Sequence, residues 1–292
     1  MNNYSLENNL FFVNVSKNGA ELQTIKNLKN NIELLWNPDL KFWNRISPVL
    51  FPIVGKLKNN LYEENGNTYS MLQHGFARNM EFEVIQQTQN SIAMQLESNS
   101  ETLAQYSFDF VLKISYILIE NCLDIHYSVT NLSTVEMPFS IGAHPGFAID
   151  KPLNQYKLIF DQPFTADRYL IQDGLYTNET SPTMKNSQEL LLSNELIHSD
   201  AVVFKNVPFY RVTLCELDNT PIVTVSSSDF PHWGFWSKPD APFFCIEPWA
   251  GLADSIHATG NLRDKEGIEI LAPNQTKQFS FSIEMPAIVQ EN

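Results

Sequence analysis

The chain has 292 residues, of which 43% are hydrophobic and 18% charged, a balance typical of a globular protein with a large buried core. Nineteen basic against 33 acidic residues leave a net charge of −14, which opposes binding to nucleic acid and to anionic membrane surfaces. The three cysteines lie far apart and form no CxxC pair, so they indicate neither a disulfide framework nor a thiolate zinc site.

The first residues, MNNYSLENNLFFVNVSKNGAEL, lack the basic segment and the uninterrupted apolar run of a secretory signal. No later run approaches the roughly 18 apolar residues that a membrane-spanning helix needs. We therefore expect a cytoplasmic protein with no nucleic-acid partner and no membrane partner.

Alternation of apolar and polar residues predicts half-buried antiparallel strands from one end of the chain to the other. The pattern appears in LFFVNVS (10–16), in LDIHYSVT (123–130) and in FSFSIEM (279–285). Turns are predicted where Asn or Gly can adopt a positive φ, namely at Asn18-Gly19, at Asn65-Gly66 and in LDNTP (217–221).

Helical periodicity is weak throughout, and ETLAQYSF (101–108) predicts only a short helix. Residues 163–192 are rich in polar residues and turn formers, which predicts loops or an irregular excursion. Strand-like sequence resumes at AVVFKNV (201–207) without a change in character. The pattern therefore predicts an all-β sandwich built as a single domain over residues 1–292.

Two histidines lie in short glycine-containing segments that interrupt the strand pattern, His74 in HGFAR and His144 in AHPGF. Loops on a β scaffold often hold catalytic groups, because the sheet fixes their position. An imidazole, with an ordinary pKa near 6.5, can transfer a proton in either direction at neutral pH. Each histidine could equally be a structural, hydrogen-bonded residue.

Glu247 lies within the apolar run of APFFCIEPWAGLADS. Burial raises the pKa of a carboxyl group, which makes Glu247 a candidate base, with a structural ion pair or a strand-end cap as the alternative. Trp249 follows closely, and HWGFWSKP (232–239) adds more aromatic rings. Such rings can stack on the C–H face of a pyranose, although core packing explains them as well.

A metal site is not predicted. His74, His144 and Glu247 could together supply two imidazoles and a carboxylate, but the sequence contains no HExxH or other closely spaced ligand pair. A serine hydrolase is not predicted either, because no GxSxG segment occurs.

Several segments together resemble one known family. The segments FPIVGKLKNNLY, QHGFAR, GAHPGF, DAVVF and CIEPWAGLADS, followed by NLRDKEGIEILAPNQTKQFSFSIEM, are similar to those of the aldose 1-epimerases, or galactose mutarotase-like proteins. The chain looks closest to the subgroup typified by the lactose-operon X protein. The resemblance implies a predominantly antiparallel, galactose mutarotase-like β-supersandwich and a cofactor-free isomerisation at the anomeric carbon of a sugar.

The resemblance also implies roles for individual residues. It makes His144 the acid that protonates the ring oxygen and Glu247 the base that takes the proton of the anomeric hydroxyl. His74 corresponds to a second histidine, which contacts the ring oxygen and neighbouring hydroxyls. Lys56 is the nearest match to an arginine of many galactose mutarotases, and Asp200 to an aspartate that binds sugar hydroxyls.

A local excess of positive charge suggests a further feature of the substrate. Five of the 19 cationic residues lie within 38 positions, namely Lys41, Arg45, Lys56, Lys58 and Arg78. A solvated basic face is one explanation. The other is that Lys56 and Arg78 bind the phosphate of a hexose 6-phosphate.

The sequence therefore predicts an aldose 1-epimerase whose partner is a small sugar or sugar phosphate, with Lys56, Arg78, Asp200 and Trp249 as binding residues. The alternative is a carbohydrate-binding or sugar-sensing protein with little turnover. The oligomeric state is left open.

Overall fold

Antiparallel strands follow one another along almost the whole chain in the computed structural model, which describes residues 3–198 and 200–286. The α-helices of these residues are single turns, α1 (Ser100–Leu103) and α2 (Asn194–Ile197). The prediction of an all-β protein is confirmed, and α1 is the short helix expected near residue 101. No helix in the described part of the chain is long and apolar enough to cross a membrane.

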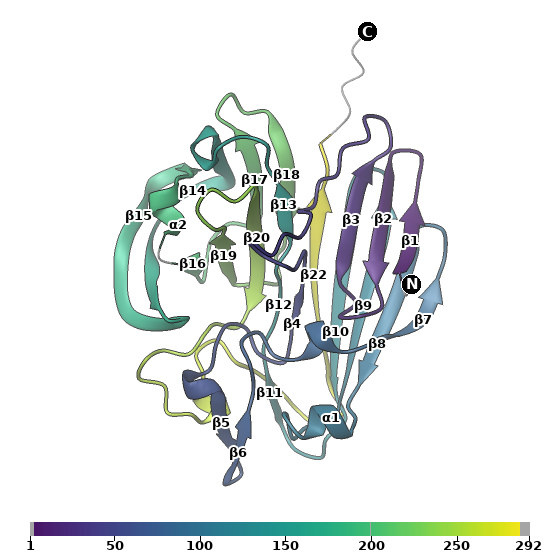
Figure 1. Cartoon of the computed structure of the whole chain (residues 1–292). Coiled ribbons are helices and arrows are strands. Elements are labelled where there is room, and N and C mark those ends of the chain that lie inside the picture. The colour runs from purple at the N-terminus through teal and green to yellow at the C-terminus, as the bar shows by residue number, and fades with distance from the viewer. Residues whose placement is uncertain (1–2, 199, 287–292) are drawn as a thin grey trace.

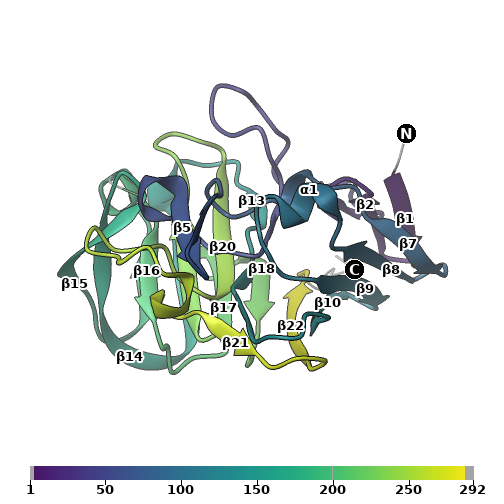
Figure 2. The same ribbon diagram turned by 90° about the horizontal axis from the view of Figure 1, so that it is seen from below.

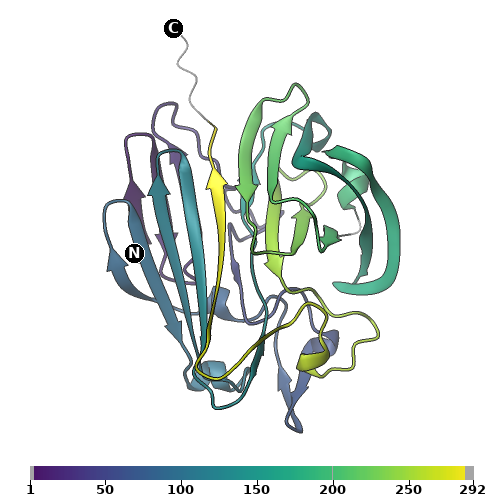
Figure 3. The same cartoon turned by 180° about the vertical axis from the view of Figure 1, so that it is seen from behind.

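The largest sheet joins both halves of the molecule. Its nine strands run antiparallel in the order β15 (Leu175–Leu191), β14 (Tyr156–Gln172), β17 (Arg211–Glu216), β18 (Pro221–Ser226), β22 (Thr276–Glu284), β10 (Cys122–Asn131), β9 (Phe110–Ile119), β8 (Ser91–Glu97) and β7 (Glu83–Gln87). Figures 1 and 3 show β22 between the two groups of strands, and Figure 2 shows the two halves side by side, with β14 and β15 at one end and β7 and β8 at the other.

Two smaller sheets cover this large sheet. One contains β1 (Asn3–Glu7), β2 (Phe11–Ser16) and β3 (Leu22–Asn27), and faces β7–β10 (Figures 1 and 3). The other runs β16 (Val202–Lys205), β19 (His232–Trp236), β20 (Phe243–Ala250), β12 (Ile141–Ala143) and β4 (Val49–Leu50), with β13 (Gly146–Ala148) paired to β20. It lies inside the curve of β14 and β15 (Figure 1). One hydrophobic cluster draws residues from both halves.

Two strand pairs complete the described β structure, β5 (Leu61–Glu64) with β6 (Asn67–Ser70) and β11 (Met137–Phe139) with β21 (Glu269–Leu271). The predicted turns all join consecutive strands. Gly19 has φ 73°, Gly66 has φ 77° and Asn219 has φ 73°, which are the left-handed conformations that favour Gly and Asn.

Of the two alternatives expected for residues 163–192, the loops are not found, whereas an irregular excursion is. This segment forms most of β14 and β15, two 17-residue strands that pair with several register shifts. Only the first part of β14, up to Phe160, also pairs with β17. Beyond that point β14 pairs only with β15. The buried residues Phe164, Tyr176, Met184 and Leu190 are separated by polar residues and register shifts, so the sequence shows little apolar alternation even though one face is covered.

Candidate active site

Strand β20 carries the predicted base. It is flanked by β19 on one side and by β12 and β13 on the other, so all eight of its residues are buried. Alternation along the strand directs Phe244 and Ile246 into the main core, and Cys245, Glu247 and Trp249 to the opposite face. Glu247 is 1% exposed and is therefore almost completely removed from solvent.

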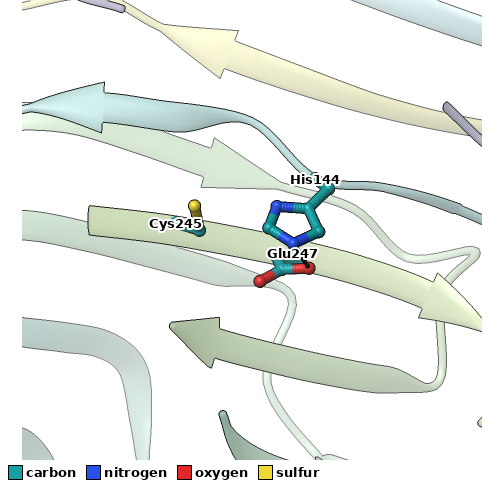
Figure 4. A group of neighbouring side chains, drawn as sticks. All are labelled: His144, Cys245 and Glu247. Atoms are coloured by element: carbon teal, nitrogen blue, oxygen red, sulfur yellow. Dashed lines mark ion pairs between the residues drawn. The ribbon is translucent and has the colours of Figure 1, made fainter. Parts of the chain in front are cut away.

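His144 lies directly over Glu247 because the segments around it are paired to the same strand. Gly142 of β12 pairs with Trp249, and Gly146 of β13 pairs with Cys245, which leaves His144 in the short link between them. Its Nε2 is 3.2 Å from Oε2 of Glu247 (Figure 4). The two atoms are close but not aligned as a hydrogen bond. Two segments separated by about a hundred residues thus meet as a buried pair.

His74 reaches this pair from a tight turn between β6 and the short 3₁₀ turn at Ala77–Asn79. Both His74 (φ 67°) and Gly75 (φ 71°) have left-handed backbones. A Cβ on Gly75 would lie 2.2 Å from the carbonyl oxygen of Phe51, so only glycine fits here. A non-glycine residue with positive φ, such as His74, is uncommon and carries conformational strain, as residues at functional sites often do.

The orientation of His74 is fixed by the backbone of a neighbouring loop. The Gly55 N–H donates to His74 Nδ1 over 3.2 Å, which leaves Nε2, 3.3 Å from the side-chain amide nitrogen of Gln73, to carry the proton of the neutral ring. The ring lies edge-on to His144, with centroids 5.7 Å apart and planes at 82°. His74 can therefore offer an N–H donor beside the His144–Glu247 pair.

A cavity of about 470 Å³ is bordered by most of the predicted site residues: His74, Arg78, His144, Asp200, Glu247 and Trp249. Lys56 does not border it. The Lys56 Nζ instead donates to the carbonyl oxygen of Asp173 over 2.9 Å, and its side chain packs against Gly174 at the tip of the β14–β15 hairpin. Lys56 thus supports the hairpin tip that forms part of the cavity wall.

Burial controls the ionisation of the central pair. It raises the pKa of Glu247 well above its ordinary value, and the nearby Asp200 charge raises it further. Burial also lowers the pKa of His144 to about 3, and Arg78 and Arg45 add to this effect. The pKa of His74 is lowered well below its ordinary value for the same main reason, with His144 and Arg78 contributing. The raised pKa expected for a buried Glu247 is therefore found.

The cavity wall next to Glu247 also carries polar groups with few protein partners. Within the described residues, the Nε1 of Trp249 and the hydroxyl of Tyr176 are buried and make no well-formed hydrogen bond, although the Trp249 side chain lies beside Glu247 and opposes the rise of its pKa. Asp200 adds a half-buried carboxylate, whose pKa is raised by burial and whose Oδ1 accepts the Ala201 N–H at 2.7 Å. Unpartnered buried donors are costly, so this wall is suited to a ligand with hydroxyl groups.

The basic residues of the sequence do not converge on the cavity. Of the five noted, all in the described part of the chain, only Arg78 borders it. Its Nη2 donates to the Gln73 carbonyl over 2.5 Å, while burial, then Arg45, lowers its pKa to about 10. Lys41 lies over the Phe42 ring, and Lys58 reaches the Ala258 carbonyl. Lys238, which the sequence analysis did not single out, adds a second cation to the wall.

One group of the described residues could act as metal ligands. The donor atoms of His144, Cys245 and Glu247 all lie within 4.8 Å of one another (Figure 4). Ligand atoms around a tetrahedral zinc ion lie roughly 3.3–3.8 Å apart, so this set would have to contract around an ion. The Cys245 thiol is fully buried, and burial together with Glu247 raises its pKa well above the ordinary value.

Sequence reasoning missed Trp43, whose ring stacks on His144 with centroids 4.8 Å apart and planes at 28°. It also missed Tyr176, which belongs to the hairpin expected to be a loop. Among the aromatic residues around position 235, only Trp236 borders the cavity, whereas Trp233 and Phe235 pack in the core. The aromatic pair in KFWNR, set in a polar turn, was the one available signal for Trp43.

Comparisons with known proteins agree with this geometry. The profile of the aldose 1-epimerase family matches residues 2–282. The chain is 30% identical to the chromosomal LacX protein of Lactococcus lactis subsp. lactis, over 95% of this chain and 97% of that protein.

A galactose mutarotase related enzyme from Lactobacillus acidophilus has 35% identity and a TM-score of 0.92, covering 99% of both chains. A galactose mutarotase-like protein from Lactobacillus casei ATCC 334 has 30% identity and a TM-score of 0.92, over 97% of this chain and 100% of that one. The fold predicted from the resemblance is confirmed, and the chain belongs to the aldose 1-epimerase family.

Proposed function

We propose that this protein interconverts the α and β anomers of a hexose by acid/base ring opening, without a cofactor. The observation that carries the proposal is the buried His144–Glu247 pair, 3.2 Å apart on the wall of the cavity, with His74 beside it. Family membership supports an epimerase of this general kind.

The reaction needs two proton transfers at neighbouring oxygens. Glu247 takes the proton of the anomeric hydroxyl, the bond between the anomeric carbon and the ring oxygen breaks, and His144 gives a proton to that ring oxygen. Rotation about the bond next to the open aldehyde presents its other face, and the reverse transfers close the ring. The two oxygens are bonded to the same carbon, so an adjacent acid and base can serve both.

The neutral pair carries one titratable proton in total. Burial favours the neutral arrangement, with the proton on Glu247, because it penalises both charged groups. Transfer of that proton to His144 produces the carboxylate base and the imidazolium acid together, with no net change in charge. The sugar hydroxyls then replace the solvent that burial excludes.

His74 is proposed to steady the oxygens rather than to exchange protons. Its Nδ1 is occupied by the Gly55 N–H, so the neutral ring presents an Nε2–H donor. Because burial keeps the pKa of His74 well below the ordinary value, the ring remains neutral at physiological pH. A neutral donor can hold the ring oxygen in the cyclic and the open form alike.

The experiment that tests this function is polarimetry on freshly dissolved α-anomers of a panel of hexoses. Acceleration of mutarotation by the wild type, but not by Glu247→Gln, is the expected result. Sugar binding without acceleration across the panel would instead support the second candidate, a sugar-sensing protein.

The substrate's phosphorylation state can be tested in the same way. Arg78 and Lys238 border the cavity, but so do the acids Asp200 and Glu247, so a phosphate dianion would meet both signs of charge. Anomerisation of glucose, galactose and their 6-phosphates can be followed by NMR exchange at low and high salt. A phosphate contact requires a preference for the phosphorylated sugar that weakens with salt. Preference for the free sugar at both salt concentrations would contradict it.

A further inference from the structure

Trp43 lies flat against the ring of the proposed acid. Its indole stacks on the His144 imidazole, with centroids 4.8 Å apart and planes at 28°. The same indole stacks on Phe243 at 5.5 Å and meets Trp236 edge-on at 5.5 Å. The Trp36 Nε1 donates to the Trp43 carbonyl oxygen over 3.0 Å. These contacts hold the indole in place with one face against the His144 imidazole.

The AHPGF segment contains a residue that makes this stack possible. A Cβ on Gly146 would lie 2.9 Å from Cζ3 of Trp43 and 3.4 Å from Cβ of Trp36. Real Cβ atoms essentially never approach another heavy atom as closely as the first of these distances, so a larger residue would displace the indole. The glycine two residues after His144 therefore serves the packing of Trp43.

The groups around His144 act in opposite directions on its protonation. Glu247 from β20 favours the imidazolium, whereas Arg78 and Arg45 oppose it, and His74 and the Cys245 thiol are neutral neighbours. Burial of the ring opposes protonation of His144 most strongly. An indole face carries the negative part of the ring quadrupole and attracts a cation lying over it. Trp236 meets the His144 ring edge-on, with centroids 5.5 Å apart, whereas Trp43 presents its face to the imidazole at 4.8 Å and can stabilise a protonated His144.

We propose that Trp43 is a positioning residue, whose indole face orients the His144 imidazole over Glu247 and favours its protonated form. The effect of Trp43 on the reaction rate rests on the proposed function, whereas the effect of Trp43 on the protonation of His144 does not. Removing the indole face destabilises the imidazolium, so less of the shared proton reaches His144. The acid limb of the pH–rate profile then moves to lower pH, and the plateau rate falls by a matching factor.

The test compares Trp43→Leu, which removes the π face, with Trp43→Phe, which retains one. Phe42→Leu is the matched control: it removes an aromatic ring from the same loop, and that ring contacts Trp36 and Lys41. Two readouts are needed, the pH dependence of kcat and KM for mutarotation, and the NMR titration of ¹⁵N-labelled histidine, assigned with His144→Asn. Circular dichroism at each pH confirms that the variants are folded.

We expect Trp43→Leu to lower kcat by about twofold to tenfold, and to move the acid limb and the His144 titration down by about 0.3 to 1 pH unit. Trp43→Phe should recover most of both effects, and Phe42→Leu should resemble the wild type.

A lower kcat with an unmoved acid limb and an unmoved His144 titration would overturn the proposal, because it indicates a purely structural role. A Phe variant as impaired as the Leu variant would also overturn it. If the wild type accelerates no sugar, the proposed function fails and the histidine titration alone decides the role of Trp43.

Discussion

Strands β10 and β20 both lie inside their sheets, but they bury different kinds of residue. In β10 the inward side chains are apolar except for Asn131, whose amide donates to the Val135 and Leu271 carbonyls, and pairing with β9 and β22 proceeds without a register shift. In β20 every residue is buried, including Glu247, whose Oε2 makes no well-formed hydrogen bond among the described residues, and neither does the Nε1 of the neighbouring Trp249. The buried polar groups of β10 are hydrogen-bonded within the protein, whereas β20 retains buried polar groups that a bound ligand can hydrogen-bond.

Glu247→Gln tests the β20 side of this comparison and has the largest expected effect. The amide keeps the shape of the side chain but cannot accept the anomeric proton, so kcat falls by about 10² to 10⁴. Polarimetry measures the rate, and Glu83→Gln on exposed β7 is the matched control. A folded Glu247→Gln protein with the wild-type rate would rule out Glu247 as the base.

The same variant also has a predictable effect on stability. Because the pKa of Glu247 is raised in the folded state, the folded protein holds this proton more tightly than the unfolded chain does. Its contribution to stability is therefore full below the unfolded pKa and is lost as the pH rises toward the folded pKa. At neutral pH, denaturant unfolding should show Glu247→Gln to be at least as stable as the wild type.

Ile125→Ala tests the β10 side. Ile125 is fully buried between Tyr116 and Phe281, and its truncation leaves a cavity that costs about 2–5 kcal/mol in the free energy of unfolding. The rate per folded molecule should stay close to that of the wild type. His126→Ala, at the exposed neighbouring position, serves as the control, with a change within about 0.5 kcal/mol. A large loss of kcat in folded Ile125→Ala would remove the distinction between the two strands.

The pH profile sharpens the description of the shared proton. Since burial lowers the pKa of His144 to about 3, the rate should persist well below pH 6 and fall about tenfold per unit only once the pair takes up a second proton. The alkaline limb marks loss of the last proton, above the ordinary range of a glutamate, because the pKa of Glu247 is raised. An acid limb half-complete near pH 6.5 would show instead that His144 ionises like a solvent-exposed imidazole.

Tyr176→Phe has the smallest expected effect and tests the unpartnered end of the cavity. Loss of one hydroxyl contact with the sugar should raise KM by about twofold to tenfold, with little change in kcat or in stability. Tyr156→Phe is the contrasting control, because the Tyr156 hydroxyl is already bonded to Asp150 and Lys151. That variant should lose stability and keep its KM, and the reverse pattern would assign the structural role to Tyr176.

Local sequence was a reliable guide where a strand has one covered face and where a turn needs positive φ. The alternation in β2, β10 and β22 follows from the period of two along a strand, and the turns at Gly19 and Gly66 follow from the conformational freedom of glycine. The β14–β15 hairpin was missed because its few buried apolar residues, Phe164, Tyr176, Met184 and Leu190, are separated by polar residues and register shifts, which hide the period of two.

For the candidate site, the sequence alone determined which residues have suitable chemistry: two histidines beside glycine, and a glutamate in an apolar run. Only the tertiary structure decided which of them meet. Pairing of β12 and β13 with β20 brings His144 to 3.2 Å from Glu247, and the hairpin tip keeps Lys56 from the cavity wall while adding Tyr176 to it. Contacts across about a hundred residues depend on strand pairing, and so do the pKa shifts, because burial is a property of the folded chain and not of any local segment.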